Sequence, residues 1–336
     1  RQGRASQGLL APILDAVRHR AGKGRQDAAA DFAAAFYQRL SEDELPAHSA
    51  DAWAALADDI LEFVRQRKPG TANVRLFNPT AAKHGWESPH TVLQIVNDDM
   101  PFLVDSVTMA LAERGIGVHV LGHPIVKLQR DKAGRLTGVG EGHAESIMSL
   151  EIDRQSASDA AEVEAAIRGV LADVRTIVED WPTMRDRMLA ITEDLGKRPM
   201  PIGDAARAEA QEFLRWAAAD HFTFLGYREY RVKRQGGEDV LAADVETGLG
   251  LLRTKAVGKP RRLSTLAAHD MQASGQVDAL ILTKTNARAT VHRPGYMDYI
   301  GVLGFDADGR PVAEQRFIGL YTSGAYTRRP WEIPLV

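Results

Sequence analysis

One stretch constrains the fold more than any other: the apolar residues 91–96 lead into a helix-forming segment, residues 101–115, through the letters Asn-Asp-Asp-Met. Asp98 and Asp99 stand where a helix is usually capped, and Pro101 falls in a first helical turn, which tolerates a missing N–H. A buried strand that turns at once into a helix is typical of a layered fold of sheet and helices. The stretch therefore predicts an α/β or α+β protein.

The same stretch also predicts a site for a small ligand. A helix N-terminus offers free N–H groups to a carboxylate, and neighbouring carboxylates would hold an ammonium group. Because an amino acid carries both groups, we take Asp98, Asp99, Met100, Pro101 and Phe102 as a candidate amino-acid-binding loop. Helix capping is the alternative explanation of the two aspartates. A catalytic pair of carboxylates lacks a third partner in the sequence.

Composition excludes several classes of protein. The 336 residues, 44% hydrophobic and 26% charged, suffice for two compact domains and a terminal extension. A net charge of −3 is unlike that of a nucleic-acid-binding protein, and no apolar run is long enough to span a membrane. The absence of cysteine removes disulfides and thiolate ligands and favours a cytoplasmic location. The chain begins without Met and ends in an apolar segment, which we interpret as a piece of a longer protein.

Residues 1–70 have the apolar spacing of helices. Apolar positions recur three and four residues apart in three segments, residues 8–21, 30–40 and 49–67. We expect a helical N-terminal segment without chemistry of its own.

Residues 73–192 show the order strand, helix, strand, strand, helix, which is ferredoxin-like (βαββαβ) if one more strand completes the sheet. Residues 74–77 and a segment after Trp181 are the two candidates for that strand. In the last predicted strand, residues 145–154, Met148, Leu150 and Ile152 alternate with Ser149, Glu151 and Asp153, which indicates one buried and one wet face.

A capping box, Ser156 with Asp159, opens the long helix that follows. Residues 193–204 contain two prolines and two glycines and are the predicted linker. Residues 205–336 carry mostly strand signals, with a hairpin loop at residues 306–309, and predict an antiparallel sheet with short helices on one side.

The motif search finds no catalytic residue, cofactor loop or metal site. The glycines of residues 138–143 have the wrong spacing for a dinucleotide fingerprint and no helix after them, so we expect a hairpin turn there. His119 and His123 lie four residues apart on a predicted strand, a spacing that does not bring two ligands onto one ion.

A second polar cluster stands out near the C-terminus. Its members are Lys284, Arg288, His292, Arg293, Tyr296 and Asp298. We take it as a candidate anion pocket or interface. Turn chemistry after Pro294, with tyrosines anchoring a sheet edge, is the alternative explanation.

Six blocks occur in an order that resembles the N-terminal region of the large bacterial NAD-specific glutamate dehydrogenases. They are NDDMPFLVDSVTMALAERG, ESIMSLEIDR, DVRTIVEDW, DHFTFLGYREY, KTNARATVHRPGYMDYIGV and RFIGLYTSGAY. The resemblance runs from about residue 73 to the end and implies an ACT-like domain at 73–192 and a PAS-like domain at 205–336.

The resemblance also implies a function. The parent enzyme would convert L-glutamate, NAD and water to 2-oxoglutarate, ammonia and NADH in a catalytic region downstream. This chain would be a non-catalytic region for regulation and oligomerisation, which binds no cofactor and contacts other subunits, the catalytic region and an amino-acid effector. A stand-alone amino-acid sensor is the alternative.

ACT domains bind amino acids at a loop with the pattern Asp-x-Pro-Gly, and the corresponding run here is Asp99, Met100, Pro101 and Phe102. Phe102 replaces the glycine and fills space that a ligand would occupy. The resemblance therefore leaves two roles open for this loop, amino-acid binding and oligomer contact through Phe102.

Overall fold

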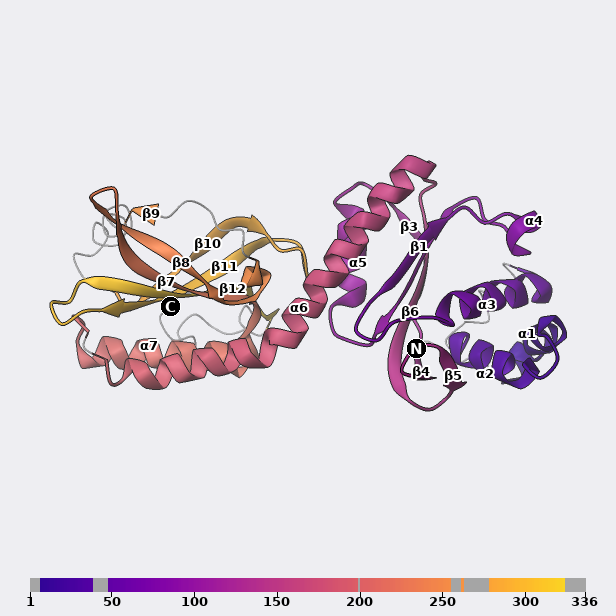
Figure 1. Ribbon diagram of the computed structural model, residues 1–336, viewed down its shortest axis with the longest axis horizontal. Coiled ribbons are helices and arrows are strands. Elements are labelled where there is room, and N and C mark those ends of the chain that lie inside the picture. The colour runs from indigo at the N-terminus through magenta and orange to yellow at the C-terminus, as the bar shows by residue number, and fades with distance from the viewer. Residues whose placement is uncertain (1–6, 39–47, 199, 255–260, 263–277, 324–336) are drawn as a thin grey trace. The chain divides into compact units, whose positions relative to one another are not determined.

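The computed structural model describes residues 7–38, 48–198, 200–254, 261–262 and 278–323, and the chain forms two compact units, Arg1–Leu171 and Ala172–Val336 (Figure 1). The boundary between the units falls inside the long helix α6 (Ala157–Leu195). The predicted linker, residues 193–204, lies in the second unit, where it joins α6 to α7 (Asp204–Trp216). The domain bounds 1–70, 73–192 and 205–336 stay predictions.

The first unit begins with three helices, α1 (Gln7–Arg20), α2 (Gln26–Phe36) and α3 (Ala50–Val64), at the positions that the apolar spacing predicted. The Ser49 hydroxyl caps α3 by accepting from the N–H of Ala52 at 3.2 Å. Apolar side chains of these helices share one core with strand residues such as Val96 and Ile147. The helical segment is therefore packed on a sheet.

That sheet is antiparallel throughout. Its strands are β1 (Asn73–Phe77), β2 (Thr91–Asp98), β3 (Val118–Gly122), β4 (Ile125–Arg130), β5 (Leu136–Val139) and β6 (His143–Ile152), and a short helix, α4 (Ala81–His84), joins the first two. The order is β1-β2-β6-β4-β5, and β3 pairs with the same edge of β6 as β4 does, at residues 149–152 where β4 pairs with residues 143–146. The strand beside β2 is β1, so the expected βαββαβ order differs in its last strand. Of the two candidates for that strand, residues 74–77 are the ones that complete the sheet, and they precede β2 in the chain.

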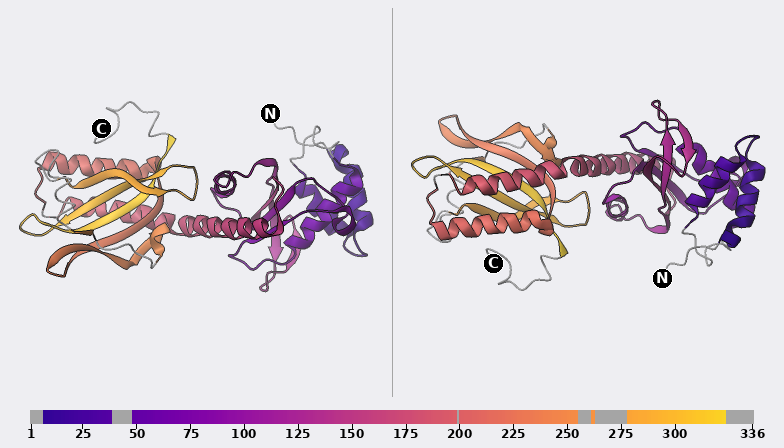
Figure 2. Two further views of the ribbon diagram at one scale, coloured as in Figure 1. Left: turned by 90° about the horizontal axis from the view of Figure 1, so that it is seen from above. Right: turned by 90° about the horizontal axis from the view of Figure 1, so that it is seen from below.

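Helices cover both faces of this sheet. Helix α5 (Leu103–Ala112) and the first part of α6 lie on one face, and α1, α2 and α3 lie on the other (Figures 1 and 2). The predicted alternation on β6 is found, because Met148, Leu150 and Ile152 are buried whereas Ser149 and Glu151 are half-buried, but residues 145–148 are buried on both faces. Alternation within one strand does not reveal a second helical layer contributed by another part of the chain. The capping box of α6 is confirmed, because the N–H of Asp159 donates to the Ser156 hydroxyl at 3.2 Å.

The glycines of residues 138–143 form a connection from β5 to β6, the two strands on either side of β4, instead of the expected hairpin turn. Gly142 has a φ of +95°, and a Cβ there would lie 2.3 Å from the carbonyl oxygen of Leu128. Glycine is required because the chain crosses close to the backbone of β4.

The second unit is a six-stranded antiparallel sheet of order β10-β11-β12-β7-β8-β9. Its strands are β7 (Phe222–Gln235), β8 (Glu238–Gly250), β9 (Arg261–Arg262), β10 (Leu280–Arg288), β11 (Tyr296–Phe305) and β12 (Pro311–Tyr321). A π-turn, η2 (Ala217–His221), leads from α7 into β7, and a 3-10 turn, η3 (Leu251–Arg253), follows β8.

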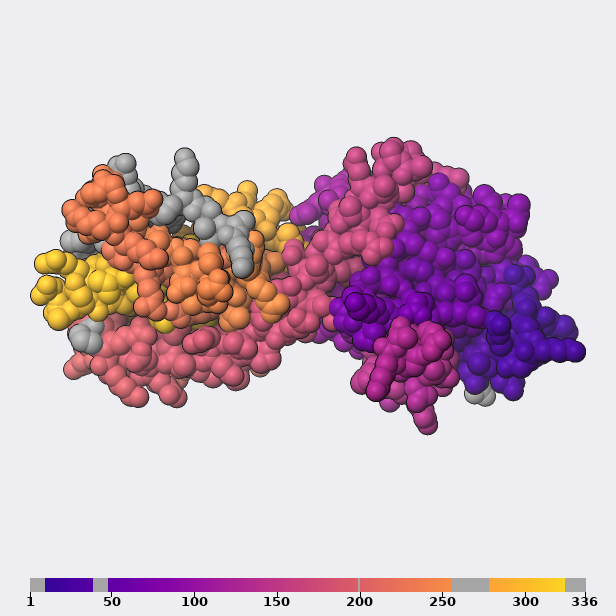
Figure 3. All heavy atoms as spheres, in the orientation of Figure 1, coloured from indigo at the N-terminus to yellow at the C-terminus, as the bar shows by residue number. Residues whose placement is uncertain are grey.

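Helix α7 and the C-terminal part of α6 cover one face of this second sheet and form the surface on that side (Figures 2 and 3). Their apolar side chains pack against Phe224 and Phe317. The hairpin loop at residues 306–309 is confirmed, with the N–H of Gly309 donating to the carbonyl of Asp306 at 3.1 Å. The α+β class is thus confirmed, with helices on one side of this sheet as expected.

Candidate functional site

The predicted ligand loop is a tight turn between β2 and α5. The N–H of Asp99 donates to the carbonyl of Ala144 at 3.1 Å, which holds the loop to β6. Phe102 is the N-cap of α5 and adopts the left-handed conformation, with a φ of +70°. No side chain caps this helix, so the capping explanation of Asp98 and Asp99 is wrong. A bulky residue at positive φ is unusual and marks a backbone held in place by its surroundings.

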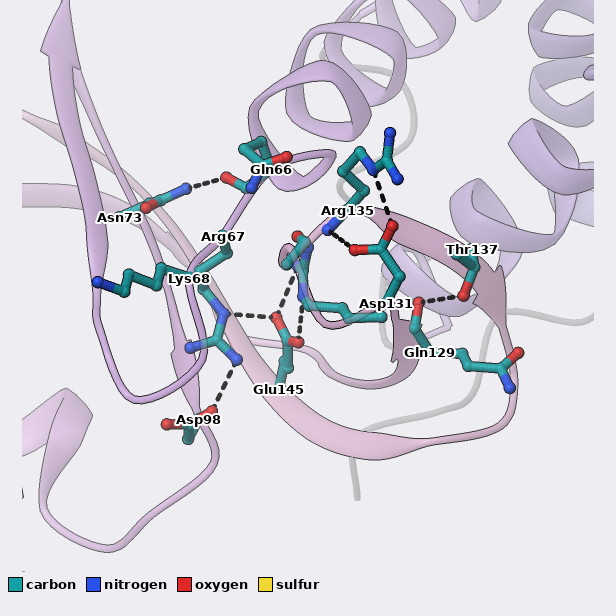
Figure 4. Close-up of polar contacts among 12 residues, drawn as sticks. Gln66, Arg67, Lys68, Asn73, Asp98, Gln129, Asp131, Arg135, Thr137 and Glu145 are labelled. Atoms are coloured by element: carbon teal, nitrogen blue, oxygen red, sulfur yellow. Dashed lines mark hydrogen bonds and ion pairs between the residues drawn. The ribbon is translucent and has the colours of Figure 1, made fainter.

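Asp98 makes an ion pair with an arginine that the sequence did not single out. Arg67 lies just beyond α3, and its Nη2 donates to Oδ1 of Asp98 at 2.7 Å (Figure 4). The Arg67 side chain is only 2% exposed, whereas that of Asp98 is 33% exposed. Nη1 of Arg67 also donates to the carbonyl of Thr71 at 2.8 Å. The loop therefore begins at a carboxylate that is fixed from within the protein.

The ion pair belongs to a larger group, which we call the Arg67 network and which comprises Arg67, Asp98, Arg130 and Glu145. Arg67 Nε donates to Glu145 Oε2 at 3.0 Å (Figure 4). Arg130 Nε donates to Glu145 Oε1 at 2.6 Å. Arg130 Nη2 donates to Glu145 Oε2 at 2.9 Å. Two guanidinium groups and two carboxylates balance one another, as buried charges must. The network ties the end of α3 to β2, β4 and β6.

Two members of the network, Glu145 and Arg67, have shifted pKa values. Burial opposes the charged form of Glu145, but hydrogen bonds from Arg130 and Arg67 outweigh it and hold the pKa of Glu145 below its usual value. Burial likewise disfavours the charged form of Arg67, yet the hydrogen bonds to Glu145 and Asp98 raise its pKa. Because neither Glu145 nor Arg67 exchanges a proton near neutral pH, the role of the network is positional. It fixes the start of the loop.

The other loop residues differ in exposure. Asp99 and Pro101 are exposed, and Met100 and Phe102 are half-buried. The structure thus brings the five predicted residues into one turn, with one carboxylate fixed by Arg67 and another at the surface.

The second predicted cluster is a series of cross-strand pairs on β10 and β11. The ammonium group of Lys284 pairs with the buried Asp298, and the guanidinium of Arg288 lies 5.8 Å from the ring centre of Tyr296. Arg293 Nη2 donates to the carbonyl of Tyr321 at 2.9 Å. His292, which precedes Arg293 in the loop between β10 and β11, has a φ of +78°. Lys284, Arg288 and Arg293 therefore all have partners within the chain.

The histidines considered for a metal have separate partners. His119 Nε2 lies 2.7 Å from Asp153 Oδ1, and its ring stacks on His90 at 4.0 Å. His123 Nε2 lies 2.7 Å from the Ser146 hydroxyl. Within the described residues no group of three or more His, Asp or Glu side chains is arranged to hold a metal ion, and no helix there is long and apolar enough to cross a membrane.

Sequence reasoning missed Arg67, Arg130 and Glu145. They are separated by 15 to 78 positions from one another, and no spacing rule connects them. One signal was present, because Ile147 stands two residues from Glu145 on the supposedly wet face of β6. An apolar residue there indicates that this face is also buried.

Comparison with known proteins identifies the class. The model of the family "Glutamate dehydrogenase, ACT1 domain" matches residues 32–167, a range that contains β1 to β6, α5 and the Arg67 network. This part of the chain is similar to the ACT1 domain of glutamate dehydrogenases.

The whole chain is similar to bacterial NAD-specific glutamate dehydrogenases. The enzyme of Halomonas elongata is 32% identical over 345 residues, which cover 100% of this chain and 21% of that protein. The enzyme of Pseudomonas aeruginosa is 32% identical over 315 residues, which cover 91% of this chain and 19% of that protein. The enzyme of Mycobacterium tuberculosis is 26% identical over 259 residues, which cover 73% of this chain and 14% of that protein.

The chain spans about a fifth of the length of these curated relatives. It matches the N-terminal region of the large bacterial NAD-specific glutamate dehydrogenases, and their catalytic domain is absent from it. The resemblance inferred from the six sequence blocks is thereby confirmed.

Proposed function

We propose that this chain is the regulatory and oligomerisation region of an NAD-dependent glutamate dehydrogenase and supplies no catalytic residue. Oxidative deamination of L-glutamate to 2-oxoglutarate and ammonia, with NAD as hydride acceptor, would take place in the part of the protein beyond the matched fifth. The observation that carries this proposal is the similarity over the full chain at 32% identity to only 21% of the relative. A cytoplasmic location fits this activity.

The regulatory input that we propose is an amino acid at residues 98–102. Its carboxylate would approach the N-terminus of α5, and its ammonium group would lie near Asp98 and Asp99. Arg67 holds Asp98 in the ligand-free chain, so binding would exchange that ion pair for one between Asp98 and the ammonium group of the ligand. The positive φ of Phe102 supports this role, since the backbone has the conformation that glycine would take at this position.

The route from loop to enzyme would run through the Arg67 network. A ligand that draws Asp98 toward its ammonium group changes the partner of Arg67, and Arg67 also contacts Glu145 on β6. A ligand regulates only by binding two states of the protein with different affinity. The two states here would be Asp98 paired with Arg67 and Asp98 turned toward the ligand.

A second candidate role, subunit contact, is favoured by the edge of the sheet. Strand β3 pairs with β6 on one side, and its apolar side chains Val118, Val120 and Leu121 are 37% to 48% exposed. The opposite edge, β1, is covered by Arg168 of α6, which donates to the carbonyl of Val74 at 2.6 Å. An uncovered apolar edge strand invites pairing with another strand. We propose that β3, with Phe102, contacts a second copy of the chain.

For the second unit we propose a PAS-like domain that contacts the downstream catalytic region. Its antiparallel sheet with helices on one face is compatible with that fold. The cluster from Lys284 to Asp298 would then be an interface, because its cations already have partners and no longer need an anion.

The deciding experiment is a thermal-shift panel on this chain with the common amino acids, 2-oxoglutarate, NAD and adenine nucleotides. A ligand of the native state raises the melting temperature as its concentration exceeds the dissociation constant. We expect an amino acid to raise it, and Asp99→Asn to remove the effect. Asp308→Asn, at an exposed loop of the second unit, is the control. NADH formation by the chain alone would contradict the proposal.

The same panel on the full-length enzyme separates the regulatory region from a stand-alone sensor. If this chain regulates catalysis, the amino acid that shifts its melting temperature also changes the rate of NADH formation, and Asp99→Asn abolishes both effects. A thermal shift with no effect on the rate would favour the sensor.

A further inference from the structure

We propose that the second unit binds a small organic monocarboxylate at Arg228, on the face of its sheet opposite α6 and α7. The site consists of Arg228, Tyr230, Tyr299, Glu314 and Arg316, which we call the Arg228 cluster. This inference goes beyond the proposed function and does not depend on the loop at residues 98–102.

The register of the sheet places the cluster. Arg228 of β7 lies directly opposite Arg316 of β12, and the next pair is Tyr227 with Phe317. Tyr227 and Phe317 belong to the core beneath α6 and α7. Because successive residues of a strand point to opposite faces, Arg228 and Arg316 lie on the other face.

Arg316 is fully compensated within the cluster. Its Nη2 donates to Glu314 Oε2 at 3.1 Å, and its Nε donates to the hydroxyl of Tyr299 at 2.9 Å. The ring centre of Tyr230 lies 3.8 Å from its guanidinium carbon and that of Tyr299 lies 5.0 Å away. The Glu314 side chain is completely buried, so its charge is committed to Arg316.

Among the described residues Arg228 has no such counter-ion. It is only 2% exposed, and its Nη2 donates to the carbonyl oxygens of Leu252 and Thr254, which carry no net charge. Its Nε has no hydrogen-bond partner, and no carboxylate of the described residues pairs with it. Two arginines and one glutamate leave one buried positive charge, and two like charges placed directly opposite repel each other. A buried charge without a partner is strongly unfavourable, which points to a missing anion.

The chemistry of the cluster selects the kind of anion. The planar fork of a guanidinium matches the two oxygens of a carboxylate. A single uncompensated charge is balanced by a monoanion, whereas phosphate near neutral pH would bring excess negative charge. The rings of Tyr230 and Tyr299 offer apolar surface to the organic part of the ligand.

The test compares thermal shifts of the chain with sodium acetate, butyrate, chloride and phosphate at matched ionic strength. We expect acetate and butyrate to raise the melting temperature saturably, with no such effect of chloride or phosphate. Arg228→Met should remove the response and should melt higher than the wild type without ligand, because it deletes the uncompensated charge. Arg231→Met, on the same strand but 64% exposed, is the matched control and should retain both wild-type properties.

Three results would overturn the proposal. Arg228→Met could melt lower than the wild type, which would make Arg228 a tether for the chain at Leu252 and Thr254. Chloride or phosphate could act as strongly as the carboxylates, which would remove the assigned ligand class. Acetate and butyrate could have no effect on the wild type.

A second measurement serves if Arg228→Met does not fold. The Nε–Hε resonance of Arg228, assigned by comparison with Arg228→Lys, should move on titration with acetate. A resonance that stays unmoved at saturating acetate contradicts binding. The Asp99→Asn variant separates the two sites, because a response to acetate that survives it does not come from the loop at residues 98–102.

Discussion

The Arg67 guanidinium lies 2.7 Å from the Asp98 carboxylate and joins the segment that follows α3 to the last residue of β2. A helical segment and the loop that enters α5 are thereby held by one buried side chain. The same guanidinium binds Glu145, so the position of the loop depends on three separate elements of the first unit.

Arg67→Met should lower the unfolding free energy of the first unit by about 3 kcal/mol, because it leaves Asp98 without its buried partner and removes one of the two guanidinium groups that bind the buried Glu145. Urea unfolding followed by circular dichroism measures the change. Arg135→Met is the matched control, since Arg135 is 72% exposed and makes a surface pair with Asp131. That variant should lose less than about 1 kcal/mol. Equal losses in the two variants would contradict a buried network.

Glu145 should make the first unit sensitive to acid. Its pKa is held below the value of an unfolded chain, near 4.3. Its contribution to stability is therefore complete above about pH 5 and is lost as the pH falls through the folded pKa. Urea midpoints between pH 6 and about pH 3 should decline less steeply in Glu145→Gln than in the wild type. Glu162→Gln, at an exposed site on α6, should keep the wild-type slope.

Phe102→Gly should raise amino-acid affinity at the loop. It removes a left-handed backbone cost of about 1 kcal/mol and clears space beside α5. Isothermal titration with the amino acid found in the thermal-shift panel measures the affinity. Phe102→Ala removes the ring but keeps the positive φ, so the two variants separate space from backbone. Unchanged affinity in both would show that the loop does not face a ligand.

Val120→Lys should weaken self-association of the chain. It places a charge on the exposed edge strand β3, where a second copy would bring the same charge opposite it. Sedimentation velocity should show a shift to a smaller species. Val312→Lys, at a residue of β12 with 38% exposure, is the control and should leave the distribution unchanged. A wild-type chain that is monomeric at all concentrations would rule out this interface.

Much of the local structure could be predicted. The three N-terminal helices, the capping box of Ser156 and Asp159 and the loop at residues 306–309 depend on contacts within a few residues. Apolar residues that recur every second position indicate a strand, and those that recur every three to four positions indicate a helix, so both patterns can be read from the sequence. Similarity to the glutamate dehydrogenases was visible for the same reason, because it is carried by contiguous blocks.

The candidate site was only partly predictable. The loop at residues 98–102 was located, but the explanation of its aspartates as helix caps was wrong, because Phe102 occupies the N-cap position. Asp98 is recruited instead by Arg67, 31 positions earlier. A side chain that has both a local and a distant partner available takes the one that also satisfies a buried charge.

The sequence by itself determined the elements, their approximate bounds and the family, since these depend on neighbouring residues or on aligned blocks. Only the tertiary structure decided that β1 flanks β2, that both faces of β6 are buried and that Arg67, Asp98, Arg130 and Glu145 form one group. The physical reason is that ion pairs and sheet neighbours are chosen by the free energy of burial over the whole unit, and separation along the chain carries no record of that choice.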